Sequence, residues 1–202
     1  MSETAKLIIQ GKEYEFPVVV GTENEVAIDI KALRSATKGI ITIDPGFKNT
    51  GSCESKITFL DGEKGILRHR GYAIEELTKK ASFLEVAYLI IFGELPTRAQ
   101  FEKWENDIKH HALLNEEMKD IIDGFPTGAH PMGMLASLTN ALTAFNPATV
   151  DITSDKEIYT AITKLMGKFP VLAAWAHSKN QGTPLNYADN SLTYVENIMQ
   201  MM

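Results

Sequence analysis

The sequence contains a single cysteine, Cys53, among its 202 residues. One cysteine cannot form an internal disulfide, and a metal site built on several cysteine ligands is excluded by the same count. Positive charge is also scarce, because 20 lysines and arginines face 26 aspartates and glutamates and leave a net charge of -6. Nucleic-acid backbones are bound by clustered Lys and Arg, so nucleic acid is not expected as a partner.

Long apolar runs are missing as well. The densest stretch, Val86–Phe92, is seven residues long, whereas a membrane-spanning helix needs about 20. Met1–Lys6 contains an acidic residue and no long apolar core, so it does not resemble a signal peptide. We therefore expect a soluble, cytoplasmic protein without a membrane partner.

The first third of the chain has the pattern of strands and turns. Lys6–Gln10 and Glu13–Phe16 flank Gly11, and apolar and charged residues alternate in the second segment, as in a half-buried hairpin. Further along, Asp44-Pro45-Gly46 has the composition of a turn.

A second hairpin is predicted just before the helical part. Lys56–Leu60 leads into Asp61-Gly62, and Gly65–Arg68 leads back out. From Ala73 onward the apolar residues recur at helical spacing, so the chain is predicted to be mainly α, with a small β-containing region at 1–70 and a helical region at 71–202.

Three pairs of polar residues predict where helices begin. Each pair places Ser or Thr three residues before Glu or Gln, which is the pattern of a capping box. The pairs are Ser82 with Glu85, Thr97 with Gln100, and Ser154 with Glu157. Gly93 is expected to end the first of these helices, and Pro170 is expected to end or kink the third.

Two later segments are unusually apolar. Met132–Phe145 has few polar residues on any side, which is typical of a helix buried in a domain or in an interface. Near the last residue, Leu192, Val195, Ile198, Met199 and Met202 are predicted to share one helical face. No capping residue follows them, so we expect the chain to be cut inside a larger fold.

The histidines do not suggest a metal site. His110 and His111 are neighbours, and neighbouring side chains of an α-helix diverge by about 100°. We expect His111 to be half-buried and His110 to be solvated, although a site using both with His177 stays an alternative. His130 precedes Pro131 at the start of an apolar helix, where it either ties the incoming loop to the helix or contributes to an anion site; the structural role is favoured.

Lys164 and Lys168 lie four residues apart, on either side of Gly167. They could grip a phosphate together, but solvated lysines at this spacing are common. Nucleotide-binding and nucleophile-elbow motifs are absent. The residues by themselves therefore indicate no mechanism.

Several separated blocks, in order and essentially without gaps, resemble citrate synthase, in particular the long bacterial type known from Gram-negative organisms. The blocks are Asp44–Phe47, Gly51–Gly62, Gly65–Leu77, Leu84–Tyr88, Gly93–Thr97, His130–Met132 and Asn190–Tyr194. The resemblance implies the N-terminal part of the family's all-α large domain, truncated and preceded by a small β-hairpin region.

The resemblance also implies an activity. Citrate synthases condense acetyl-CoA with oxaloacetate and water to give citrate and CoA, a step of the tricarboxylic acid cycle, and require no cofactor. Removing a methyl proton beside a thioester needs both a base and a partner for the oxyanion. The family motifs that carry these groups come later than Met202. No catalytic, cofactor-binding or metal-binding residue is therefore assigned here, and the segment alone is expected to be inactive.

One regulatory site is implied in part. The resembling bacterial enzymes are hexamers inhibited allosterically by NADH, and His111, Lys164 and Lys168 match histidine or basic positions of that site. His110 stands where the regulated enzymes carry an arginine, and Asn146 stands where they carry a tyrosine. Because an adenine-facing ring and a strong phosphate ligand are lost, tight NADH binding is not expected.

The resemblance further implies a homo-oligomer, dimer or hexamer, in which helices 132–145 and 155–176 contribute to the dimer interface. The alternative to an enzyme fragment is a stand-alone helical module that is derived from the enzyme and binds a synthase subunit or a nucleotide.

Overall fold

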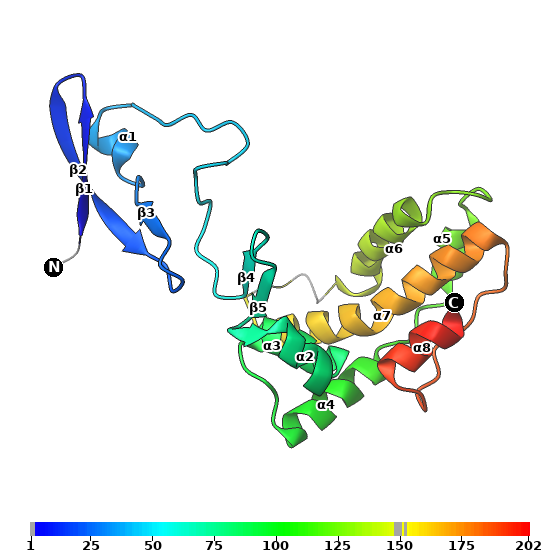
Figure 1. Ribbon diagram of the computed structural model, residues 1–202. Helices are drawn as coiled ribbons and strands as arrows, with labels where there is room; N and C mark the ends of the chain where they lie inside the picture. The colour runs from blue at the N-terminus through cyan, green and yellow to red at the C-terminus, as the bar shows by residue number, and fades with distance from the viewer. Residues whose placement is uncertain (1–2, 148–150, 152) are drawn as a thin grey trace. The chain divides into compact units, whose positions relative to one another are not determined.

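The computed structural model describes residues 3–147, 151 and 153–202. The chain divides into two compact units, Met1–Lys56 and Ile57–Met202. Figure 1 shows their elements: strands and one short helix in the first unit, and a small sheet followed by helices in the second.

The first unit is built on the predicted hairpin. β1 (Thr4–Ile9) pairs antiparallel with β2 (Lys12–Val20), which pairs with β3 (Val26–Ile28). Gln10 and Gly11 connect the first two strands with φ angles of 50° and 78°, as a tight two-residue hairpin turn requires. The hairpin around Gly11 is thus confirmed, whereas β3 and the single-turn helix α1 (Leu33–Ala36) were not predicted.

The turn at Asp44-Pro45-Gly46 is also confirmed. The backbone N–H of Phe47 donates to the carbonyl oxygen of Asp44 at 3.2 Å, and Gly46 has a φ of 84°. The Asp44 carboxylate accepts a hydrogen bond from the backbone N–H of Asn49 at 2.8 Å. Its side chain therefore acts locally, as in many turns.

The second unit begins with the second predicted hairpin, which is confirmed as β4 (Thr58–Asp61) and β5 (Ile66–His69), with the short β6 (Tyr72–Ala73) beside them. The second unit starts at Ile57, so this hairpin lies in the same unit as the helices. One reason is Arg70, whose guanidinium donates to the carbonyl oxygen of Ile90 at 2.8 and 3.3 Å.

The first helices begin where their caps indicate. α2 (Ile74–Lys80) precedes α3 (Phe83–Phe92) and α4 (Arg98–His110). Both α3 and α4 have complete capping boxes, and the C-cap of α3 is a left-handed glycine, as predicted. These caps give hydrogen-bond partners to backbone N–H and C=O groups that have none within the helix at its ends.

The remaining helices pack around one long element. α7 (Asp155–Gln181) contacts α4, α5 (Glu117–Asp123), α6 (Pro131–Phe145) and α8 (Tyr194–Met201), and Figure 1 shows it running through the middle of the helical unit. A core of buried apolar side chains lies along it, including Trp175, Leu172, Leu138 and Met118. The mainly α fold class is therefore confirmed.

Pro170 was expected to end or kink this helix; an end there is wrong, because α7 continues to Gln181 with Pro170 inside it. Pro170 has no N–H to donate to the carbonyl oxygen of Met166, one turn earlier. The hydroxyl of Tyr194, on α8, donates to that oxygen at 3.1 Å. The hydrogen bond that proline removes is thus replaced by a side chain from another helix.

α6 is buried along one side and exposed along another. Met134, Leu138 and Leu142 are buried, whereas the side chain of Met132 is 64% exposed. In the part of the chain that the structure describes, no helix is both long enough and apolar enough to cross a membrane.

Candidate functional site

The candidate site forms where the C-terminal end of α4 meets the middle of α7. Gly167 makes this approach possible, because a Cβ atom at that position would lie 2.5 Å from the carbonyl oxygen of Ile108 and 3.0 Å from the carbonyl carbon of His111. Contacts this short do not occur for real side chains, so the crossing needs glycine. The crossing brings Lys164 and Lys168 to the end of α4.

Lys168 is buried rather than solvated, so the expectation of a solvated lysine is wrong for this residue. Only 7% of it is exposed, and its Nζ donates to the carbonyl oxygen of Leu113, just beyond α4. Burial lowers its pKa, and the nearby charge of Lys164 lowers it further. Because few water molecules can surround this ammonium group, an anion beside it would favour its charged form.

Lys164 joins the site to the end of α6. Its Nζ donates to Oδ1 of Asn146 at 3.0 Å, and Nδ2 of Asn146 donates to the carbonyl oxygen of Leu142 at 3.1 Å. Asn146 is the C-cap residue of α6. The lysine therefore bridges two helices of the core while remaining partly exposed.

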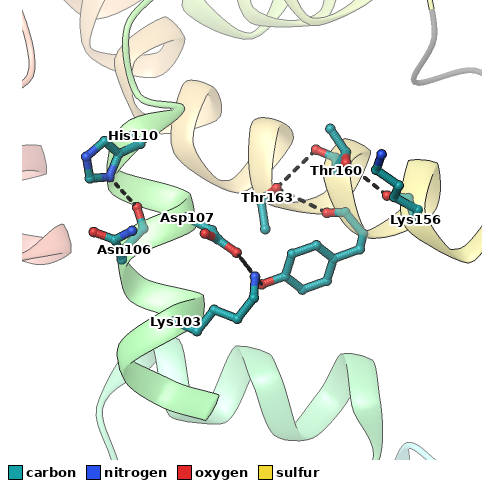
Figure 2. Close-up of polar contacts among 8 residues, drawn as sticks. Lys103, Asn106, Asp107, His110, Lys156, Thr160 and Thr163 are labelled. Atoms are coloured by element: carbon teal, nitrogen blue, oxygen red, sulfur yellow. Dashed lines mark hydrogen bonds and ion pairs between the residues drawn. The ribbon is translucent and has the colours of Figure 1, made fainter. Parts of the chain in front are cut away.

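His111 completes the set of residues that the resemblance implied. Burial lowers the pKa of its ring, and the charges of Lys164 and Lys168 lower it further, while Asp107 opposes them. The charges of both lysines therefore act on the ring of His111. As expected, His111 is partly buried and His110 is exposed; Nδ1 of His110 lies 2.8 Å from the carbonyl oxygen of Asn106, as Figure 2 shows.

A neighbouring polar group on the same two helices was not anticipated. The hydroxyl of Tyr159 donates to Oδ2 of Asp107 at 2.7 Å, and the Nζ of Lys103 bonds the same carboxylate and lies 4.7 Å from the centre of the Tyr159 ring. Figure 2 shows Lys103 and Asp107 directed to the same point from α4. Burial alone would raise the pKa of Asp107, but these two hydrogen bonds hold it below its ordinary value.

The sequence signals for this group were incomplete. Lys103 and Asp107 are four residues apart, a spacing at which opposite charges pair on a helix. The Lys103–Asp107 pair could therefore have been predicted from the sequence. Tyr159 lies 52 residues from Asp107 in the chain. No local pattern could have linked the two.

The arrangement offers positive charge and hydrogen-bond donors, the two features that an anion-binding site needs. Asp107, the carboxylate that faces His111, is already engaged by Lys103 and Tyr159, so it neutralises little of the charge of the neighbouring lysines. The cluster of His111, Lys164 and Lys168, called the basic cluster below, thus has an excess of basic groups.

His130 lies at the start of α6 as its N-cap residue. Nδ1 of His130 accepts a hydrogen bond from the backbone N–H of Met132 at 3.2 Å, so the ring caps α6 as the structural role requires. Over the described ranges, which omit residues 1–2, 148–150 and 152, no group of three or more His, Cys, Asp or Glu side chains could hold a metal ion.

The architecture of the second unit, small antiparallel strands followed by helices packed around α7, defines a helical fold class that is shared with solved enzymes. The structure of citrate synthase from Pyrobaculum aerophilum superposes with a TM-score of 0.71 at 26% identity, over 99% of this chain and 46% of that one. The enzyme from Thermotoga maritima superposes with a TM-score of 0.67 at 27% identity, over 80% of this chain and 41% of that one.

Sequence comparison agrees with this superposition. The family model for the citrate synthase C-terminal domain matches residues 46–202. The citrate synthase of Corynebacterium glutamicum is 43% identical over 198 residues, which are 98% of this chain and 45% of the relative. Citrate synthase 1 of Mycobacterium tuberculosis is 41% identical over 98% of this chain and 46% of its own length.

The chain therefore belongs to the citrate synthase family. It spans less than half the length of these relatives.

Proposed function

We propose that this chain is the N-terminal part of a citrate synthase of the long bacterial type, and that the whole protein condenses acetyl-CoA with oxaloacetate to give citrate and CoA. The observation that carries the proposal is the family match over residues 46–202, together with 43% identity to the enzyme of Corynebacterium glutamicum. The single cysteine and the acidic balance agree with a cytoplasmic enzyme.

The segment is proposed to be inactive by itself. It accounts for 45% of the length of that relative, and two of its histidines have structural partners. His130 caps α6, and His110 lies against the backbone of its own helix. Neither is placed as a base opposite an oxyanion donor, which this chemistry requires.

An assay for CoA release tests this proposal. The purified chain, incubated with acetyl-CoA and oxaloacetate, is expected to release no CoA above a reaction without protein. The intact Corynebacterium glutamicum enzyme serves as the positive control. Steady CoA release by the chain alone would overturn the assignment of the chemistry to other parts of the protein.

We further propose that a second copy of the protein packs against α6 and α7, as the resemblance implies. A groove there is lined by Met132, Leu135, Ala136, Thr139, Asn140, Thr143 and Phe169. Met132 is 64% exposed and Phe169 is 42% exposed, and apolar surface of this kind is typical of an interface. Light scattering should show an oligomer that Met132→Glu dissociates; a monomer at all concentrations would contradict this.

The basic cluster is proposed to be a regulatory anion site, comparable to the NADH site of the resembling enzymes but weaker. Lys164 donates to Asn146, and Lys168 donates to a backbone carbonyl, so each ammonium has one donor fewer to offer to a ligand. Neither an aromatic ring at 146 nor an arginine at 110 is present to offset this loss.

Introducing an arginine at position 110 and a tyrosine at position 146 is expected to strengthen NADH binding. Stacking and a charge-assisted hydrogen bond together contribute about 2 kcal/mol, which corresponds to about 30-fold in Kd. Fluorescence titration of His110→Arg/Asn146→Tyr measures the gain, and the same pair in a Lys164→Gln background is the control. Tight binding by the unmodified chain, or no gain in the double variant, would contradict the proposal.

A stand-alone interaction module is not favoured. The family match and the superpositions follow the enzyme fold along most of the chain, and no contact in the described residues points to a different role.

A further inference from the structure

Lys164 belongs to the basic cluster and is also bonded to the end of a second helix. Its Nζ donates to Oδ1 of Asn146 at 3.0 Å, and Nδ2 of Asn146 donates to the carbonyl oxygen of Leu142 at 3.1 Å. The backbone N–H of Asn146 donates to the carbonyl oxygen of Thr143 at 3.4 Å. A single asparagine therefore joins Lys164 to the last turn of α6, residues 142–145.

The last turn of α6 has no positive charge of its own. Carbonyl groups at the C-terminal end of a helix carry partial negative charge, and a cation near them stabilises the helix. The last turn of α6 contains no basic residue. Lys164 supplies the charge from α7, which contacts α6 and lies beside it in Figure 1.

Both lysines of the basic cluster are held by neutral oxygen atoms. Lys164 donates to the side-chain amide of Asn146, and Lys168 donates to the backbone carbonyl of Leu113. A carboxylate in either place would oppose the ammonium charge, whereas an amide oxygen orients the ammonium group and leaves its charge in place. An ammonium group has three donors, so others remain for a ligand.

Holding Lys164 in advance favours the binding of an anion. A free lysine side chain loses much rotamer freedom when a ligand immobilises it, and that loss weakens binding. Because Asn146 already restricts Lys164, less freedom is lost when an anion binds. The effect is reciprocal: whatever the formed turn adds to anion binding, the bound anion adds to the stability of the turn.

We propose that Asn146 couples the basic cluster to the last turn of α6. The formed turn holds Lys164 in position for a phosphate-type anion, and an anion held by Lys164 stabilises the turn. Asn146 is a positioning residue, because it acts on the ligand through Lys164. The inference rests on the proposed regulatory anion site. It goes further by naming the side chain through which occupancy of that site reaches α6, the helix proposed to face a second copy.

Inorganic pyrophosphate is the probe for this coupling, because it has phosphate groups and no base to stack on residue 146. Calorimetry at constant ionic strength measures its Kd for the 202-residue chain. Hydrogen exchange measures the protection of the backbone N–H groups of residues 143–146. Saturating pyrophosphate is expected to raise this protection about fivefold, and Asn146→Ala is expected to raise Kd by about the same factor. In Asn146→Ala, pyrophosphate should no longer change the protection.

Asn146→Asp tests whether the acceptor must be neutral. Aspartate has nearly the same shape and still accepts from Lys164, but its charge opposes the bound anion. Kd should therefore rise about tenfold or more, beyond the effect of alanine. Asn106→Ala is the matched control, since it removes the same amide from an exposed position of α4. It should leave Kd and the protection within about twofold.

The outcomes separate the coupling from the anion site itself. If pyrophosphate binds but Asn146→Ala leaves Kd unchanged, or if the protection of residues 143–146 does not respond to bound pyrophosphate, the coupling is overturned and the anion site stands. The coupling is also overturned if Asn146→Asp binds pyrophosphate as tightly as the unmodified chain. If pyrophosphate binds no more tightly than chloride, both the coupling and the regulatory anion site are overturned.

Discussion

Gly167 shows how one residue decides where two helices meet. Its missing side chain lets α7 approach the last turn of α4, and the basic cluster forms around that crossing. Without the crossing, Lys168 could not reach the carbonyl oxygen of Leu113. The crossing depends on the missing Cβ atom of Gly167, and the pattern of apolar residues in the sequence does not predict where such an atom must be missing.

Gly167→Ala is therefore expected to destabilise the protein. The added Cβ would overlap a backbone oxygen, and overpacking of this kind costs about 3 kcal/mol, of which helix propensity returns about 1 kcal/mol. Urea unfolding followed by circular dichroism measures the difference. Gly133→Ala in α6, where nothing lies within 4 Å of the new Cβ, is the control and should be neutral or stabilising. Equal effects of the two would contradict the account of the crossing.

His111 is expected to make stability depend on pH. Its folded-state pKa lies below the ordinary value of 6.5 because of burial and because Lys164 and Lys168 face it. Between the two values the unfolded chain binds more protons than the folded one, so this contribution to stability is fully present above the unfolded-state pKa and is lost as the pH falls below it.

The free energy of unfolding at about pH 7.5 and at about pH 5.5 tests this effect. His111→Gln should lose less stability on acidification than the unmodified protein. Lys164→Gln should fall between them, because it removes one of the charges facing the ring. The same loss in all three proteins would show that His111 does not titrate as argued.

Individual elements differ in how far local sequence defines them. The hairpin around Gly11 and the helix starts at Ser82 and Thr97 were predicted because each depends on residues within a few positions of one another. At Pro170 the local sequence left an end and a kink of the helix both open, and α7 continues through that residue. Its replacement donor, Tyr194, lies 28 residues beyond the accepting carbonyl.

The Tyr194 hydroxyl is expected to stabilise α7 at that point. Tyr194→Phe leaves the carbonyl oxygen of Met166 without this donor, which costs about 1–2 kcal/mol for a buried group. In a Pro170→Ala background, a backbone N–H returns to the position and the same substitution should cost less. A double-mutant cycle of unfolding free energies measures the coupling. If Tyr194→Phe lowered the free energy of unfolding equally in both backgrounds, the Tyr194 hydroxyl would not be replacing the missing N–H of Pro170.

At the scale of the whole molecule, the mainly α class, the β-containing start and the family were all accessible from the sequence. The three basic residues of the proposed regulatory site were named from resemblance, but the burial of Lys168 and the Tyr159–Asp107 contact were not foreseen. Those features join residues more than 50 positions apart. They depend on tertiary packing, which local patterns do not encode.

The central claim is that this chain is a working part of a citrate synthase whose chemistry needs the rest of the protein. The most direct test is a single polypeptide in which the chain replaces the matched 45% of the Corynebacterium glutamicum enzyme. CoA release from acetyl-CoA and oxaloacetate by this chimera, and none by the chain alone, is the expected result. A chimera that is folded and oligomeric but releases no CoA would contradict the claim.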